Sequence, residues 1–416
     1  MTKKKILVLA HYFYPEVAST GQILTELCEK LQKKFEVTAI CTVPCYTGKI
    51  EEKYKIQNVY YEKYQDINII RVKVSEFDKS NKISRIKNIL DYFFRARKEI
   101  RKLKKENYDL VYTISQPPVL GGMLGCYAKK KLKAKLIYNI QDFNPEQTMA
   151  VKYSKSKLLL KLLMSIDKNS CKKSDLIITV GRDMQQTLEK RFENKMVPNN
   201  VVINNWIDEK EIYPVSKDNK KIQEFKNKYG INNKFIIMYS GNIGLYYDLE
   251  NIVKIMGKYT NDDVAYTFIG AGAVKEKLEN YVKENNLKNF YFIPYQPKSE
   301  LIYSLNSADI HLVTNAKGIK GVSVPSKIYG VMATNIPILG ILEEGSEAYK
   351  IIKDSNCGII AETGDYEEIE KEIKNIVNKK YDYISKYNNG RAYLENHFTK
   401  DKSIDKYIEE IEKLVK

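Results

Sequence analysis

Short apolar runs recur along the whole chain, and each leads through a loop into a stretch with helical periodicity. The first run, residues 5–10, is continuously apolar, as a strand covered on both faces of a sheet must be. A helical pattern over about residues 22–33 follows it. Strand, loop and helix in this order build a doubly wound parallel sheet, which binds ligands at the carboxyl ends of its strands. The sequence therefore predicts an α/β fold with functional residues in the loops that follow the strands.

Two such series follow one another, which fits a chain of 416 residues that forms two domains. The first continues with predicted strands over residues 35–42, 67–74, 109–114, 134–140, 175–180 and 201–203, of which 67–74 is predicted to be an edge strand. A polar stretch over about residues 207–234 separates the two series. The second has predicted strands over residues 235–239, 265–269, 290–293, 309–313, 336–341 and 358–360. We expect two tandem Rossmann-like sheets with a crevice between them as the binding site.

The net charge of +17, from 69 basic and 52 acidic residues, suggests an anionic partner such as a nucleotide, a phospholipid surface, a nucleic acid or an acidic glycan. Compositional drift toward lysine is the alternative explanation. A nucleic-acid-binding protein is the less favoured hypothesis, because the basic residues are spread over many predicted helices without a recognised binding motif. The six cysteines have no zinc-ligand spacing, so no metal site is expected and the thiols are predicted to be reduced in the cytoplasm.

The sequence also predicts how the chain relates to a membrane. It has no signal peptide pattern and no apolar run long enough to span a bilayer. The segment 84–105 is a basic amphipathic helix with nine basic and two acidic residues, and it could lie on the anionic inner face of the cell membrane. Alternatively, its apolar stripe packs only on its own domain. The apolar segment 158–164 is assigned to the core, because it is too short to span.

Residues 322–337 have the pattern of a loop, a helix start and an exit turn. Pro325 suits a position just before a helix, Ser326 can cap it, and Lys327 stands in the first turn. A helix N-terminus with a serine and a mobile lysine is an anion site, because free N–H groups and a cation converge there. A capped surface helix with a solvated lysine is the alternative.

Two loops of the first series carry further candidates. Thr20 and Gly21 stand where the first helix begins and could let a phosphate approach the backbone, or they could form an ordinary turn. The strand over residues 134–140 is followed by Asp142 and Glu146, whose carboxylates could share one cleft. Alternatively, Asp142 caps the next helix and Glu146 supports its dipole.

Taken together, these motifs resemble those of the family-4 retaining glycosyltransferases of the GT-B fold. The resemblance is closest to the subgroup from bacterial O-antigen and capsule clusters typified by the fucosamine transferase WbuB. It rests on five motifs in order: H-Y-F-Y-P-E at residues 11–16, Q-D-F-N-P-E at 141–146, S-G-N-I-G at 240–244, G-A-G at 270–272 and P-S-K-I-Y-G at 325–330.

The resemblance implies a glycosyltransferase that transfers a sugar, expected to be an N-acetylated amino or deoxy sugar, from a UDP-sugar to a lipid-diphosphate-linked glycan. It implies retention of configuration without a metal or cofactor. The domains would be 1–206 for the acceptor and 207–395 for the donor, facing each other across a cleft, with a helix at 396–416 returning to the first. The donor site would contain the following residues: Thr20, Gly21, Asn242, Ile243, Gly244, Gly270, Gly272, Lys320, Pro325, Ser326 and Lys327.

Lys327 is predicted to stabilise the departing diphosphate, with Lys320 as its helper. On the acceptor side the resemblance points to His11, Glu16, Asp142 and Glu146. The chain departs from many relatives in one respect: the positions of their Glu-x7-Glu pair are Val322 and Gly330 here, and Leu245 replaces a basic residue. A UDP-sugar 2-epimerase on the same fold is the alternative enzyme; it would need no acceptor.

Overall fold

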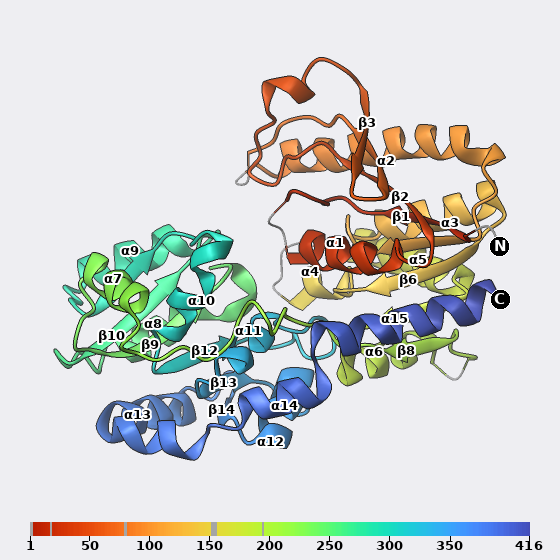
Figure 1. The fold of residues 1–416 in the computed structure, drawn as a ribbon. Helices are drawn as coiled ribbons and strands as arrows, with labels where there is room; N and C mark the ends of the chain where they lie inside the picture. The colour runs from red at the N-terminus through yellow and green to blue at the C-terminus, as the bar shows by residue number, and fades with distance from the viewer. Residues whose placement is uncertain (1–2, 17–18, 79–80, 151–155, 194) are drawn as a thin grey trace. The chain divides into compact units, whose positions relative to one another are not determined.

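The computed structural model describes residues 3–16, 19–78, 81–150, 156–193 and 195–416. It divides the chain into two compact units, an N-terminal unit of residues 1–204 with 404–416 and a C-terminal unit of residues 205–403 (Figure 1). The predicted boundary at 206 lies two residues from this division. The chain re-enters the N-terminal unit at Ile404, later than the predicted position 396.

The N-terminal unit contains an eight-stranded sheet in the order β3-β4-β2-β1-β5-β6-β7-β8. Neighbouring strands are parallel except β3 and β4. Its strands are β1 (Lys5–Leu9), β2 (Glu36–Thr42), β3 (Val59–Tyr64), β4 (Ile67–Val72), β5 (Leu110–Ile114), β6 (Lys135–Ile140), β7 (Leu176–Thr179) and β8 (Asn200–Val202). The central strands are buried throughout, as their continuous apolar runs predicted.

The prediction that residues 67–74 form an edge strand was wrong. β4 lies between β2 and β3, and β3 is the edge strand that the sequence analysis missed. β3 has the sequence V-Y-Y-E-K-Y and is only partly buried, so it lacks the apolar run that identified the other strands. Two residues, Gln65 and Asp66, join it to β4, and Gln65 has a φ of +53°. Because this turn contains neither glycine nor proline, the sequence lacks the usual signal of a hairpin.

Helices cover both faces of this sheet. α2 and α3 pack with β1, β2, β4 and β5 in one hydrophobic cluster, while α1 and α15 lie on the face of Tyr112. The helices of the unit are α1 (Ser19–Leu31), α2 (Lys82–Lys102), α3 (Leu120–Leu132), α4 (Glu146–Ala150), α5 (Lys157–Lys173), α6 (Arg182–Phe192) and most of α15 (Lys400–Val415), with short 3₁₀ turns η1 (Glu52–Tyr54) and η2 (Leu103–Lys105).

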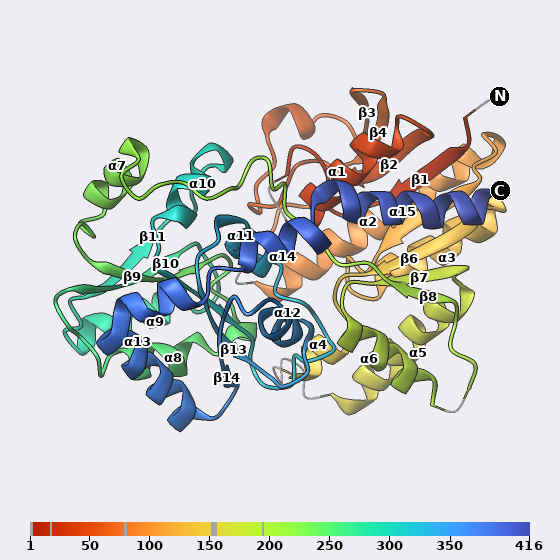
Figure 2. The same ribbon diagram turned by 60° about the horizontal axis from the view of Figure 1, so that its bottom comes forward.

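The last helix belongs to the N-terminal unit from Ile404 onward, as predicted for a chain end that returns to the first domain (Figure 2). Tyr407 is buried there, and its hydroxyl accepts a hydrogen bond of 3.0 Å from the Asn139 amide of β6. Its ring lies 6.4 Å from the ring of Tyr112. The chain end thus completes the core beneath β5 and β6.

The C-terminal unit contains a six-stranded sheet in the order β11-β10-β9-β12-β13-β14, and all its paired strands are parallel. The predicted strands of the second series are all confirmed. They are β9 (Phe235–Ser240), β10 (Val264–Ile269), β11 (Phe290–Ile293), β12 (Ile310–Thr314), β13 (Ile338–Leu342) and β14 (Gly358–Glu362). The helices are α7 (Lys220–Lys228), α8 (Leu249–Met256), α9 (Lys275–Glu284), α10 (Lys298–Asn306), α11 (Lys327–Thr334), α12 (Glu347–Ser355), α13 (Tyr366–Lys386) and α14 (Gly390–His397), with the 3₁₀ turn η3 (Leu245–Tyr247).

Two helices of the N-terminal unit expose apolar side chains. In α2, Tyr92, Phe93, Ala96 and Ile100 are buried, whereas Ile83, Ile86, Leu90 and Phe94 are exposed. We call these four exposed residues the outward stripe. In α5, Leu158, Leu159 and Leu162 are exposed, and Leu158 is 81% exposed.

The assignment of residues 158–164 to the core was therefore wrong at these three positions. The first two turns of α5 extend beyond the packed part of the helix, where Asp167, Ser170 and Cys171 are buried. Within the described part of the chain, no helix is both long enough and apolar enough to cross a bilayer.

Candidate functional site

Two glycine-bearing loops at the ends of β9 and β10 fit tightly against each other. Gly270 has a φ of +141°, and a Cβ at this position would lie 1.9 Å from the carbonyl oxygen of Gly241. A Cβ on Gly272 would lie 2.2 Å from the Ile243 carbonyl oxygen. The Ile243 N–H donates to the Ala271 carbonyl at 2.9 Å, which joins the loops. Only glycine permits this approach, so the structure brings all five predicted donor residues of these loops, including Asn242 and Gly244, together.

The third predicted donor segment lies at the start of α11. Pro325 precedes the helix and its carbonyl accepts from the Ile328 N–H at 3.1 Å. Ser326 occupies the N-cap position, but its backbone is helical and its side chain makes no capping hydrogen bond. The predicted serine cap was wrong, because a cap requires an extended backbone at this residue.

Lys327 does not extend into solvent. Its side chain is part-exposed along its length, but Nζ is buried and lies 3.4 Å from the ring centroid of Tyr239 and 4.3 Å from that of Tyr247. A Cβ on Gly241 would lie 3.7 Å from this nitrogen. The prediction of a mobile lysine was therefore wrong, although the structure does place the lysine against the glycine loops.

The amine of Lys327 has no hydrogen-bond acceptor within the described residues. Burial lowers its pKa well below the usual range, because the charged form loses its hydration. The aromatic faces of Tyr239 and Tyr247 compensate only in part. Most buried polar groups in proteins have a hydrogen-bond partner, so a buried amine without an acceptor requires an explanation such as a catalytic role, a water or an ion.

Lys320 is directed elsewhere. Its Nζ donates to the Glu344 carbonyl in the loop after β13, and it is exposed. The backbone N–H groups of Gly318 and Lys320 donate to one carboxylate oxygen of Glu343, at 2.8 and 2.9 Å. Glu343 therefore holds the lead-in loop, and the helper role of Lys320 stays a prediction.

Thr20 and Gly21 stand in the first turn of α1. The Thr20 hydroxyl donates to the Gln116 side chain at 2.8 Å, which links the start of α1 to the loop after β5. A Cβ on Gly21 would lie 3.3 Å from the backbone carbonyl of Tyr12. The glycine thus allows the helix to begin close to the loop that follows β1.

His11 is buried at the end of β1 and stacks on the rings of Tyr12 and Tyr92. Its Nε2 lies 3.1 Å from the side-chain oxygen of Asn88 in α2. Burial lowers the pKa of His11 to about 4, so the imidazole is neutral at neutral pH. Asn88 in turn donates to the Ser75 carbonyl at 2.7 Å. His11 therefore fixes α2 and the chain that follows β4.

Glu16 has a similar positioning role in the neighbouring loop. One of its carboxylate oxygens accepts from the backbone N–H groups of Cys45 and Tyr46, the latter at 2.8 Å. These residues follow β2, so Glu16 holds the β2 loop against the β1 loop.

Asp142 and Glu146 have different surroundings. The Asp142 backbone N–H donates to Ser115 Oγ at 3.2 Å, its Oδ1 accepts from the Gln147 amide at 3.3 Å, and burial raises its pKa to about 6. Both Glu146 oxygens accept from Arg191, at 2.6 Å each. Asp142 is thus free to change its charge, whereas Glu146 is held in an ion pair.

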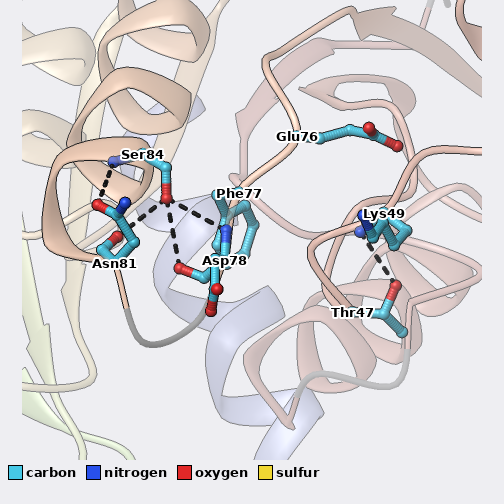
Figure 3. A pocket seen from close by; sticks show the side chains of 7 residues that line it. All are labelled: Thr47, Lys49, Glu76, Phe77, Asp78, Asn81 and Ser84. Atoms are coloured by element: carbon cyan, nitrogen blue, oxygen red, sulfur yellow. Dashed lines mark hydrogen bonds between the residues drawn. The ribbon is translucent and has the colours of Figure 1, made fainter.

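The sequence analysis did not anticipate a cavity of about 520 Å³ in the N-terminal unit (Figure 3). Thr47 and Lys49 come from the β2 loop, and Asp78, Asn81 and Ser84 lie on the opposite side near the start of α2. Glu76 and Phe77 complete the lining. We call this the polar cavity. Its only sequence signal was a polar stretch between β4 and α2, which is also typical of an ordinary loop.

Two family models match the chain in succession. The model described as Glycosyltransferase Family 4 matches residues 20–211, and the model described as Glycosyl transferases group 1 matches residues 221–393. Their division falls close to the boundary between the two structural units.

Individual proteins agree with these matches. The chain is 26% identical over 368 residues to the probable glycosyltransferase WbjE of Pseudomonas aeruginosa, covering 85% of this chain and 84% of that protein. It is 23% identical to the putative colanic acid biosynthesis glycosyl transferase WcaI of Escherichia coli K12, covering 79% and 81%. The structure of Anabaena Alr3699/HepE with UDP-glucose has a TM-score of 0.72 at 13% identity, covering 98% of this chain and 99% of that one.

Proposed function

This chain is a glycosyltransferase of the family-4 type on the GT-B fold, and we propose that it transfers a sugar from a UDP-sugar to a lipid-linked glycan during synthesis of a surface polysaccharide. We propose retention of configuration, no metal requirement and an N-acetylated amino or deoxy sugar, as in the WbuB-like subgroup. The buried, unpartnered amine of Lys327 beside the glycine loops is the observation that carries the proposal.

The proposed donor site provides the hydrogen-bond donors that a diphosphate needs. Backbone N–H groups of the glycine loops can donate to phosphate oxygens, and Lys327 supplies a further donor that has no acceptor among the described residues. HepE was solved with UDP and with UDP-glucose, which supports a uridine nucleotide here. One donor that stabilises developing charge is typically worth roughly 3 kcal/mol.

In the proposed reaction, the bond between the anomeric carbon and the diphosphate oxygen breaks, and UDP leaves with the electron pair. The acceptor hydroxyl oxygen forms the new bond on the same face of the sugar. Its proton passes to the departing phosphate. Lys327 stabilises the charge that develops on that phosphate, and Asp142 orients the acceptor hydroxyl. We assign His11, Glu16 and Glu146 to positioning the acceptor side, because their partners are protein groups.

We further propose that the enzyme acts at the cytoplasmic face of the membrane. The outward stripe lies on a helix that ends in Arg101 and Lys102, and α5 exposes three leucines beside Lys157 and Lys161. Apolar side chains among lysines and arginines are suited to an anionic bilayer surface.

The first test is a thermal-shift panel of UDP-, GDP- and dTDP-sugars. A ligand that binds the folded protein raises the unfolding midpoint. We expect a UDP-sugar to raise it, and we expect Lys327→Ala to lose this shift. Lys317→Ala is the matched control, because Lys317 is an exposed lysine of the loop that leads to α11.

The second test separates transfer from epimerisation. With a UDP-sugar and a lipid-linked acceptor, we expect UDP release and a longer glycan. If the C2 epimer of the sugar forms without any acceptor, the chain is an epimerase. Salt-dependent oligonucleotide binding without nucleotide-sugar binding would contradict the enzyme proposal altogether.

A further inference from the structure

A second cavity of the N-terminal unit, about 440 Å³ in volume, lies between α2 and the chain that follows β4. We call it the basic cavity. Its lining includes four cationic side chains and two carboxylates, namely Lys55, Lys73, Lys87, Arg95, Glu76 and Asp91. The excess of positive charge makes this cavity suited to an anion, whereas the polar cavity carries more balanced charges.

The two carboxylates already have donors. Glu76 accepts from the Ile50 N–H at 2.9 Å, and Asp91 accepts from the N–H and hydroxyl of Ser75 at 2.9 and 2.6 Å. Lys87, by contrast, makes no hydrogen bond or ion pair with any residue that the structure describes. Lys87 is therefore an exposed cation of this lining that has no partner among the described residues, whereas Lys73 and Arg95 donate to the Lys55 carbonyl and to the Asn58 side chain.

The outward stripe runs along the same helix as the basic cavity. Its Ile83, Ile86, Leu90 and Phe94 follow helical spacing, and Ile83 and Phe94 are 79% and 60% exposed. The cavity residues Lys87 and Asp91 stand three residues before Leu90 and Phe94, so each is a neighbour of the outward stripe on the helix surface. A ligand with an acidic group in the cavity would thus find an apolar surface directly beside it.

The polar cavity adjoins the basic cavity, since Glu76 lines both. Thr47, Asn81 and Ser84 bring hydroxyl and amide groups there, which also bond to neighbouring residues, and Phe77 adds an aromatic side chain, a lining suited to a sugar (Figure 3). His11 is connected to this region, because Asn88 bridges it to Ser75 of the basic cavity.

We propose that the basic cavity binds the diphosphate of the lipid-linked acceptor, with the prenyl chain on the outward stripe and the glycan toward the polar cavity. This proposal rests on the proposed function and names the acceptor's anchoring site. It accounts for a cavity with an excess of positive charge, for the outward stripe on the same helix and for the polar cavity that shares Glu76. It assigns Lys87 and Lys73 to the phosphate and Leu90 and Phe94 to the hydrocarbon.

The test is calorimetric titration of the full chain with farnesyl diphosphate, with and without excess UDP. We expect both ligands to bind at the same time. The variant Lys73→Gln/Lys87→Gln should lose about tenfold or more in farnesyl diphosphate affinity, or ~1.4 kcal/mol per factor of ten, and keep its UDP affinity. Lys98→Gln is the matched control, because Lys98 is an exposed lysine of α2 that does not line the cavity. Leu90→Ser/Phe94→Ser should weaken farnesyl diphosphate binding and leave inorganic diphosphate binding unchanged.

Three results would overturn the proposal. Inorganic diphosphate could bind as tightly as farnesyl diphosphate, which would make this a site for free phosphates. UDP could displace farnesyl diphosphate, which would place the probe in the donor site. The cavity variant could weaken only the binding to phosphatidylglycerol vesicles, which would make the surface a general bilayer contact. Failure of the proposed function would look different, since UDP-sugars would not bind while farnesyl diphosphate still did.

Discussion

Arg191 of the N-terminal unit and Lys327 of the C-terminal unit are both buried cations near the ends of parallel strands, but their surroundings are opposite. Arg191 donates to Glu146 at 2.6 Å through two nitrogens and to Asp167 at 2.5 Å through a third. It also lies over the ring of Phe143. The amine of Lys327 lies against two aromatic rings and has no acceptor in the part of the chain that the structure describes.

The pKa values follow this difference. Hydrogen bonds and the charges of Glu146 and Asp167 outweigh burial and raise the pKa of Arg191, whereas burial alone lowers the pKa of Lys327. The partners of Arg191 offset the cost of burying its charge, whereas the buried amine of Lys327 has no such partner among the described residues. The comparison therefore assigns Arg191 to stability and is consistent with our proposal that Lys327 binds the donor.

The largest expected effect is on the free energy of unfolding, and it tests the assignment of Arg191 to stability. Arg191→Met leaves the carboxylates of Glu146 and Asp167 buried without their cation, so we expect the free energy of unfolding to fall by about 3–5 kcal/mol. Urea denaturation measures it. The triple variant with Glu146→Gln and Asp167→Asn should recover part of the loss, because it removes the uncompensated charges. A loss below about 1 kcal/mol in the single variant would show that the cluster is not structural.

Lys327→Met should have little effect on stability and a large effect on sugar transfer. We expect the free energy of unfolding to stay within about 1 kcal/mol of the parent or to rise, because the substitution removes a buried amine that has no acceptor. Sugar transfer should fall by about 10²–10³-fold, since one donor to the departing diphosphate is lost. Denaturation and initial transfer rates measured on the same preparation check both. Unaltered transfer would contradict the assignment of Lys327 to the donor site.

Most of the fold could be predicted from sequence because its strands are covered on both faces. Buried strands such as β1 and β9 are short continuous apolar runs, and glycine at the end of a run is required where two loops touch. β3 could not be predicted in this way, because it is a half-exposed edge strand whose sequence mixes tyrosine with charges.

The sequence motifs named candidate site residues but could not give their geometry. The motifs identified Lys327, yet its burial depends on Tyr239 from β9 and Tyr247 from η3, which are some 80 residues away in the sequence. Glu146 likewise has the spacing of a functional carboxylate, and only the fold places Arg191 against it. The two cavities have no motif, because they form where the β2 loop meets α2.

The unpartnered state of Lys327 also predicts a proton linked to binding. In the free protein its pKa lies well below 10.5, so any stability that this group contributes is present above pH 10.5 and lost as the pH falls toward the lowered pKa. A bound diphosphate favours the charged amine. UDP binding should therefore take up as much as about one proton in this window, and its affinity should fall as the pH rises. Titration at about pH 8.5 in buffers with different ionisation enthalpies measures the uptake, which Lys327→Met should abolish. No uptake in the parent protein would mean that the amine is already charged when free.

The smallest expected effect concerns Asp142 and Glu146, the two carboxylates that follow β6. It again compares a buried group that lacks a charged partner with one that is held in an ion pair. Burial raises the pKa of Asp142 above its unfolded value of 3.8 to about 6, so its favourable contribution to stability is present below pH 3.8 and lost as the pH rises through 6. Asp142→Asn should therefore raise the unfolding midpoint by a few degrees more at pH 8 than at pH 4.5. Glu146→Gln should lower the midpoint at both pH values, because Arg191 loses a bidentate partner whichever way Asp142 is charged. If sugar transfer requires the ionised Asp142, the transfer rate of the parent protein should fall below pH 6. The transfer rate of Asp142→Asn should then be low at every pH. A parent rate that is flat through pH 6 would leave Asp142, like Glu146, a residue of the fold.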